Sequence, residues 1–172
     1  GACGLVPGDV VSIVLPRRVS LAQVVGTLGA MAARLVAAPL NPTYHVEELE
    51  FFIGDAEAKV VVVEAANASA KSAWLAATTL GLPTLPMELS WTASGPALTL
   101  GAGGGAPAVD LEPALPTDLA LVLHTSGTTS RPKLVPLTHK NMCASVVAVV
   151  NHYGITARDA TLIVQPLFHI GG

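Results

Sequence analysis

Short runs of apolar residues alternate along the chain with segments whose apolar positions recur at helical spacing. The runs predict strands at residues 10–15, 35–40, 59–63, 118–124 and 161–165. Apolar positions spaced by three and four residues predict helices over about 20–35, 46–56, 67–80 and 138–152. Because strands and helices alternate, the predicted fold class is α/β, with a mostly parallel sheet and helices on both faces.

Polar residues mark where the predicted helices begin. Ser20, Asn67 and Thr138 stand at the starts of the first, third and fourth helices, and each can act as an N-cap. The first helix is predicted to be amphipathic, with one apolar face made of Leu21, Val24, Val25, Leu28, Met31, Ala32 and Leu35. The sequon at Asn67 is better explained by capping than by glycosylation, since no secretory signal is recognisable.

A segment rich in glycine and proline separates two better patterned regions. Residues 94–117 contain repeated Gly and Pro and predict a long loop. The chain is therefore divided into a first α/β portion at 1–93, this loop, and a second portion at 118–172. Within the loop, the run from Gly101 to Ala106 loosely resembles a dinucleotide fingerprint, but Pro107 follows it where a helix should begin, so a linker is favoured.

The composition and the net charge argue against several classes of protein. Of the 172 residues, 51% are hydrophobic and only 12% are charged, which argues against a disordered chain. A net charge of −3 argues against a nucleic-acid partner, and no uncharged apolar segment free of Gly and Pro is long enough to span a membrane. The two cysteines, Cys3 and Cys143, are far apart, and the five histidines show no metal-ligand spacing.

One polar segment directly follows a predicted buried strand and precedes a predicted helix. It contains the residues Thr125, Ser126, Gly127, Thr128, Thr129, Ser130, Arg131, Pro132 and Lys133. Glycine lets backbone amides approach an anion, hydroxyls add donors, and the two cations supply charge, so the segment is suited to binding phosphate. It is not a Walker A loop, because Leu134 follows the lysine where that motif has Ser or Thr. The alternative is a surface turn that happens to be rich in Ser and Thr.

The same segment resembles the phosphate loop of the adenylate-forming superfamily, which includes acyl-CoA synthetases and 4-coumarate–CoA ligases. Residues 166–172 (Pro-Leu-Phe-His-Ile-Gly-Gly) resemble the next core motif of that family, and residues 8–16 and 38–44 resemble its N-terminal segments. The resemblance therefore covers nearly the whole chain. Ser130-Arg-Pro132 and the residues at 135–139 are most similar to the oxalate–CoA ligase branch.

The resemblance implies an acid–thiol ligase that uses ATP, Mg²⁺ and coenzyme A to activate a small carboxylic acid. It assigns residues 125–133 to the nucleotide phosphates, Thr125 also to Mg²⁺, and Lys133 and His169 to catalysis, with His169 beside the acyl group. Leu134 departs from the glycine common in the family, so the loop must leave at an ordinary backbone angle or carry strain.

Other family features find no counterpart in these residues, and they include the adenine-binding segment and the C-terminal domain. The resemblance therefore implies a partial N-terminal domain that is inactive by itself. A non-catalytic domain that binds a nucleotide or a partner and a nucleotide hydrolase with an unusual loop are the alternatives. The expected compartment is the cytoplasm or the peroxisome. The acid and the oligomeric state are left open by the sequence.

Overall fold

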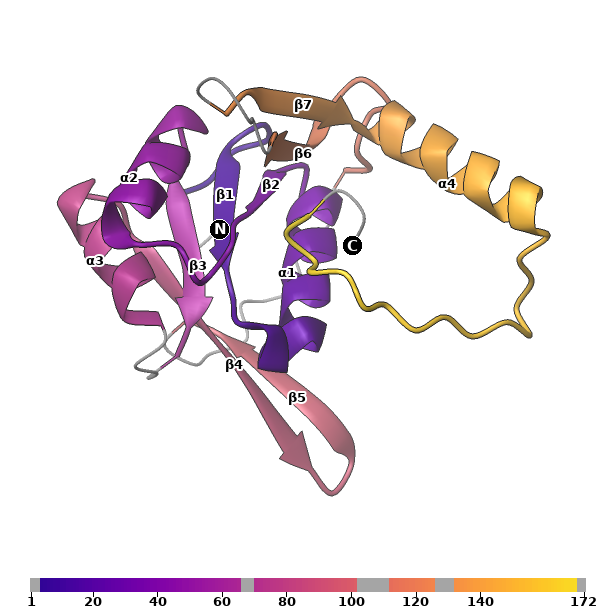
Figure 1. The fold of residues 1–172 in the computed structure, drawn as a ribbon, viewed down its shortest axis with the longest axis horizontal. Coiled ribbons are helices and arrows are strands. Elements are labelled where there is room, and N and C mark those ends of the chain that lie inside the picture. The colour runs from indigo at the N-terminus through magenta and orange to yellow at the C-terminus, as the bar shows by residue number, and fades with distance from the viewer. Residues whose placement is uncertain (1–3, 66–69, 102–111, 126–131, 170–172) are drawn as a thin grey trace.

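The computed structural model describes residues 4–65, 70–101, 112–125 and 132–169, and these form one seven-stranded sheet (Figure 1). In the order β5-β4-β3-β1-β2-β6-β7, the strands are Gly95–Leu100, Thr84–Thr92, Val60–Glu64, Val10–Val14, Val36–Pro39, Leu119–His124 and Leu134–Thr138. The five inner strands run parallel, and each edge strand pairs antiparallel with its neighbour.

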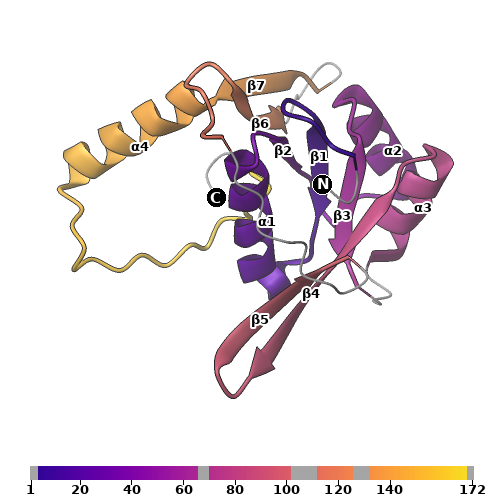
Figure 2. The same cartoon turned by 180° about the vertical axis from the view of Figure 1, so that it is seen from behind.

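The described helices lie on both faces of this sheet. They are α1 (Ser20–Ala32), preceded by the short turn η1 (Arg17–Val19), α2 (Val46–Asp55), α3 (Lys71–Thr79) and α4 (His139–Tyr153). Figures 1 and 2 show α1 on one face and α2 with α3 on the other. The predicted α/β class, with a mostly parallel sheet, is confirmed.

Side chains of the central strands alternate between two apolar layers. Val60 and Val62 pack in the layer that contains Ala22 and Ala30 of α1, whereas Val61 and Val63 pack with α2 and α3. All four valines are at most 4% exposed. A strand buried on both faces requires an unbroken apolar run, which is why residues 60–63 are all valine.

The apolar face predicted for α1 is only partly correct. The buried residues of α1 are Ala22, Gln23 and Ala30, whereas Leu21, Val25 and Leu28 are 39%, 44% and 59% exposed. The helix lies close to the sheet through small residues, and a Cβ atom added at Gly26 would meet Met87 Cε at 3.3 Å. A helix this close to its sheet leaves little room for Leu21, Val25 and Leu28, which are therefore exposed, whereas Met31 and Leu35 pack against the core layer.

The predicted N-caps Ser20 and Thr138 have opposite outcomes. Val19 is the N-cap of α1, and the Ser20 hydroxyl instead donates to the Arg17 carbonyl of η1. Helix α3 begins at Lys71 with Ala70 as N-cap, so it starts later than predicted, and Asn67 lies outside the described residues. Thr138 does cap α4, because its Oγ1 accepts a hydrogen bond from the Asn141 amide at 3.2 Å.

The structure differs from the sequence prediction at three further places. Residues 95–100 form β5, which pairs with β4 in a hairpin, although this stretch was predicted to be loop. Residues 134–138 form β7, which was not predicted. Residues 161–165 are not a strand, since no neighbouring strand pairs with them and their side chains are exposed. None of the helices in the described part of the chain is long and apolar enough to cross a membrane.

Candidate functional site

The predicted phosphate segment leaves the sheet between β6 and β7, and its two ends are hydrogen-bonded to each other. His124 is paired with Leu134 across these strands. One residue further out, the Thr125 amide donates to the Lys133 carbonyl at 2.9 Å, and the Lys133 amide donates to Thr125 Oγ1 at 3.1 Å. The loop is therefore closed at its base by two hydrogen bonds that join its first and last described residues.

The structure describes only part of the predicted phosphate-binding set. Thr125, Pro132 and Lys133 are described, and both Thr125 and Lys133 are exposed. The predicted ligands Ser126, Gly127, Thr128, Thr129, Ser130 and Arg131 lie outside the described residues. Leu134 has no positive φ angle and enters β7 directly, which confirms that the loop ends in an ordinary backbone conformation.

Thr125 keeps a chemical capacity beyond closing the loop. A hydroxyl oxygen has two lone pairs and one proton, and the Lys133 amide uses one lone pair of Thr125 Oγ1. The second lone pair fits a hard cation such as Mg²⁺, which prefers oxygen ligands and keeps several waters. Among the described residues, no group of three or more His, Cys, Asp and Glu side chains could hold a metal ion.

His124, the residue just before Thr125, was not predicted to belong to the site. Its side chain is 8% exposed, and its Nε2 lies 3.0 Å from Oδ2 of Asp55, the last residue of α2. Its ring meets Phe52 edge-on at a centroid distance of 4.7 Å. Its position at the end of a buried strand, directly before the loop, was the available signal.

All five parallel strands end at one edge of the sheet, because they share a direction. The order β2-β1-β3 means that the connections from β1 to β2 and from β2 to β3 run to opposite sides of β1. Open α/β sheets bind ligands at such a switch point, outside the carboxyl ends of the strands. The loop after β6 emerges at this edge, since β6 pairs parallel with β2.

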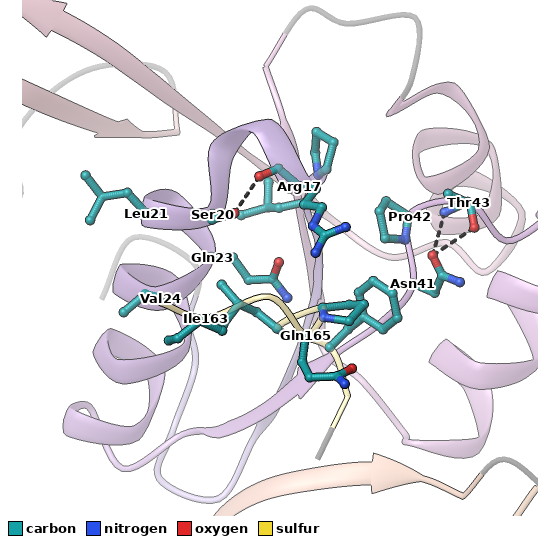
Figure 3. Close-up of a pocket in the computed structure, with 15 residues that line it drawn as sticks. Arg17, Ser20, Leu21, Gln23, Val24, Asn41, Pro42, Thr43, Ile163 and Gln165 are labelled. Atoms are coloured by element: carbon teal, nitrogen blue, oxygen red, sulfur yellow. Dashed lines mark hydrogen bonds between the residues drawn. The ribbon is translucent and has the colours of Figure 1, made fainter. Parts of the chain in front are cut away.

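A cavity of about 510 Å³ opens beside the same edge (Figure 3). It is lined by residues that follow β1 and β2, by the start of α1 and by the later segment, namely Leu15, Pro16, Arg17, Ser20, Leu21, Gln23, Val24, Asn41, Pro42, Thr43, Ile163, Gln165, Pro166, Leu167 and Phe168. An Arg17 nitrogen donates to the Val164 carbonyl across it. His169 is exposed, and neither His169 nor Lys133 is among the lining residues.

One polar group inside this cavity is not satisfied by the described residues. Gln23 is 3% exposed, and its Nε2 has no hydrogen-bond partner among them. Figure 3 shows its side chain extending from α1 toward the segment that carries Ile163 and Gln165. On the far wall, Asn41 Oδ1 accepts hydrogen bonds from both the amide and the hydroxyl of Thr43, which fixes the turn after β2.

Comparison with known proteins gives matches over almost the whole chain. The profile of the AMP-binding enzyme family matches residues 2–172. An oxalate–CoA ligase of Arabidopsis thaliana is 40% identical over 98% of this chain, and one of Saccharomyces cerevisiae is 30% identical over 94% of it. These matches take up 32% and 33% of the relatives' lengths, so the chain spans about a third of the curated relatives it matches.

Solved structures agree with these sequence matches. The crystal structure of ATP-bound MatB from Rhodopseudomonas palustris is similar with a TM-score of 0.78 and 29% identity, over 98% of this chain and 32% of that one. The AMP complex of a succinylbenzoate–CoA synthetase from Bacillus subtilis has a TM-score of 0.74 at 22% identity, covers 98% of this chain and 39% of that one, and supports the fold alone.

Proposed function

Because the chain belongs to the AMP-binding enzyme family, we propose that it supplies the phosphate-binding loop of an ATP-dependent acid–thiol ligase. The observation that carries the proposal is the loop after β6, which leaves the carboxyl edge of a parallel sheet and is closed at its base by Thr125 and Lys133. The ATP-bound similar structure supports a nucleotide as its ligand.

The proposed reaction has two steps. An oxygen of the substrate carboxylate attacks the α-phosphorus of ATP, pyrophosphate leaves, and an acyl-adenylate remains. The thiol sulfur of coenzyme A then attacks the acyl carbonyl carbon, its proton is released, and AMP leaves with the electrons of the broken bond. Negative charge grows on the leaving pyrophosphate in the first step, so catalysis depends on groups that stabilise that charge.

This chain's own residues would act on the phosphates. Amides and hydroxyls of residues 125–129 would hold the β- and γ-phosphates, the Lys133 ammonium would offset the growing charge, and Ser130, Arg131 and Pro132 would complete the loop. Mg²⁺, when bound, supplies charge that lowers the cost of bringing one more anion to ATP, and Thr125 Oγ1 is the residue that would hold it. His169 would border the acyl group.

The proposed substrate is a small carboxylic acid, as the names of the oxalate–CoA ligases at 30% and 40% identity suggest. Residues 1–172 would form part of the N-terminal domain, with its first portion at 1–93, the connecting segment at 94–117 and the phosphate-loop portion at 118–172. Contacts to adenine, ribose and coenzyme A would come from the rest of the polypeptide. The net charge of −3 gives no support to a nucleic-acid partner.

The proposed compartment is the cytoplasm or the peroxisome. Two cysteines in 172 residues provide no disulfide framework, which is consistent with a reducing compartment. Fluorescent tagging of the natural polypeptide, at each terminus in turn, tests this part of the proposal, and secretion of the tagged protein would contradict it.

Carboxylate-dependent exchange of radioactive pyrophosphate into ATP tests the proposed reaction. The natural polypeptide should catalyse exchange with one or more acids from a panel that includes oxalate and malonate. Lys133→Ala should lower the rate about 100-fold, the usual cost of one group that stabilises transition-state charge. Residues 1–172 alone should give no exchange. Exchange that Lys133→Ala leaves unchanged would contradict the proposed role of the loop.

A further inference from the structure

We infer that the His124–Asp55 pair is a positioning device for the phosphate loop, which ties the base of the loop to helix α2. The inference rests on the proposed function only where it concerns nucleotide binding, since the tie itself is a structural statement. His124 acts through Thr125 and touches no reacting atom, so it is a positioning residue and not a catalytic one.

The first support is burial together with a directed hydrogen bond. Only 8% of the His124 side chain is exposed, while its Nε2 lies 3.0 Å from Asp55 Oδ2. An ionised carboxylate can only accept, so Nε2 carries the proton and donates. Phe52 and Phe51 flank the ring at centroid distances of 4.7 and 6.5 Å, which leaves the imidazole little freedom to turn.

The second support is the place of the carboxylate. Asp55 is the last residue of α2, where the helix dipole disfavours a negative charge. Packing does not require an acid there, because the Asp55 side chain is 40% exposed. The free backbone groups at this end of a helix are carbonyls, which cannot donate a hydrogen bond. The ring N–H group of His124 provides the donor for the Asp55 carboxylate instead.

The third support is how directly the pair reaches the loop. His124 is paired with Leu134 across β6 and β7, and the next pair outward is Thr125 with Lys133, which closes the loop with two hydrogen bonds. His124 precedes Thr125, and its strand partner Leu134 follows Lys133. The hydrogen bond from His124 to Asp55 therefore holds the backbone next to both ends of the loop. Fixing β6 at this point fixes the directions in which Thr125 and Lys133 leave the sheet.

Packing alone is the competing explanation, and matched substitutions separate the two. His124→Phe keeps a ring against Phe52 but removes the donor, whereas His124→Gln places an amide nitrogen near the position of Nε2 and keeps it. Asp55→Asn weakens the acceptor. Glu57→Gln is the charge-matched control, since Glu57 is an exposed carboxylate two residues beyond Asp55.

Two readouts are taken on the natural polypeptide and on each variant. The first is hydrogen exchange of the Thr125 and Lys133 amides without nucleotide, measured by NMR against the Val61 and Val62 amides of β3. The second is the dissociation constant for MgATP. We expect His124→Phe to speed exchange of the loop amides about tenfold while the β3 amides keep their rates.

We expect MgATP affinity to fall five- to tenfold in His124→Phe and by a smaller factor in Asp55→Asn. His124→Gln should restore both readouts to within twofold of wild type, and Glu57→Gln should match wild type. The double variant His124→Phe/Asp55→Asn should be no worse than His124→Phe alone, because both changes break one interaction.

The possible failures can be told apart. If wild type shows no MgATP binding, the proposed function fails, and amide exchange still decides the inference. If wild type binds MgATP and His124→Phe matches it in both readouts, the tie is overturned and the nucleotide site stands. If His124→Phe does not fold, the Asp55→Asn variant provides the test. If its loop-amide exchange and its MgATP affinity equal those of Glu57→Gln, the proposed role of the His124–Asp55 pair is overturned.

Discussion

Two regions of this molecule contain valine-rich elements and use them in opposite ways. In β3 (residues 60–64), Val60, Val61, Val62 and Val63 are at most 4% exposed, between the layer of α1 and the layer of α2 and α3. In α4 (residues 139–153), Val146, Val147, Val149 and Val150 are 58%, 57%, 45% and 37% exposed, and none of the residues of this helix is buried.

The difference shows that an apolar pattern predicts an element but not its burial. Each central strand has helices of the described chain on both faces, and so its apolar side chains are removed from water. Helix α4 has contacts at its first turn, where the His139 amide donates to the Asp118 carbonyl, and then extends away from the sheet (Figure 1). Apolar residues stabilise a fold only where another layer covers them.

The largest predicted contrast comes from the same substitution in the two regions. Val61→Ala should lower the free energy of unfolding by about 2–3 kcal/mol, since it removes two methyl groups from a filled interior. Val147→Ala should change it by less than about 0.5 kcal/mol, because the side chain is exposed and alanine favours helix. Urea denaturation followed by tryptophan fluorescence measures both, and equal losses would contradict the comparison.

A smaller effect is predicted at the cavity between α1 and residues 163–168, which is partly covered. Gln23→Leu should raise the free energy of unfolding by about 1 kcal/mol, because it removes a buried Nε2 that has no partner among the described residues. Gln165→Leu, at an exposed position on the opposite wall, should have no effect. A loss of stability in Gln23→Leu would show that the amide has a partner in solution.

The smallest predicted effect is on the pH dependence of stability. The Leu115 amide, followed by the Arg34 side chain, holds the pKa of Asp118 below its usual value, and the Thr156 amide and hydroxyl do the same for the pKa of Asp159. A carboxyl whose folded pKa is lowered contributes stability above its unfolded pKa, near 3.9, and loses it as the pH falls through the folded value.

Substitution of these two carboxyl groups should therefore affect the stability of the sheet differently. Asp118 joins β6 to Arg34 at 3.0 Å, so Asp118→Asn should destabilise the chain at pH 7 and make its stability less sensitive to pH between 5 and 3. Asp159 lies in an exposed turn after α4, so Asp159→Asn should leave the unfolding curve of the sheet unchanged. Urea titrations at pH 7, 5 and 3 test this, and identical behaviour of the two variants would contradict it.

Most of the central elements could be predicted from sequence because their signals are local, although the inner strand β4 was missed. Unbroken apolar runs such as residues 60–63 and the cap at Thr138 need no knowledge of distant partners. Strand β5 was missed because residues 95–100 lie in the stretch rich in Gly and Pro that predicted a loop, and no element was predicted at residues 134–138, which form β7. Each of these edge strands contains one proline, Pro96 or Pro136, which edge strands tolerate.

The parts of the site that could be predicted are also those whose signal lies in adjacent residues. The loop at 125–133 was predicted from its composition and its place after a strand, because both are properties of adjacent residues. The pair of His124 and Asp55 joins positions that are 69 residues apart in the chain and depends on where α2 ends in space. The face of α1 was partly mistaken because its separation from the sheet is set by the small residues Ala22, Gly26 and Ala30, and spacing alone does not reveal that separation.

Binding of nucleotides to the natural polypeptide, measured by isothermal titration calorimetry in the presence of Mg²⁺, tests the central claim most directly. The account predicts that ATP binds more tightly than ADP and that AMP binds weakest, because the loop holds the terminal phosphates. It also predicts that Lys133→Ala weakens ATP binding while leaving that of AMP unchanged. Equal affinities for ATP and AMP, or ATP binding that is insensitive to Lys133→Ala, would contradict the claim that this loop binds the nucleotide phosphates.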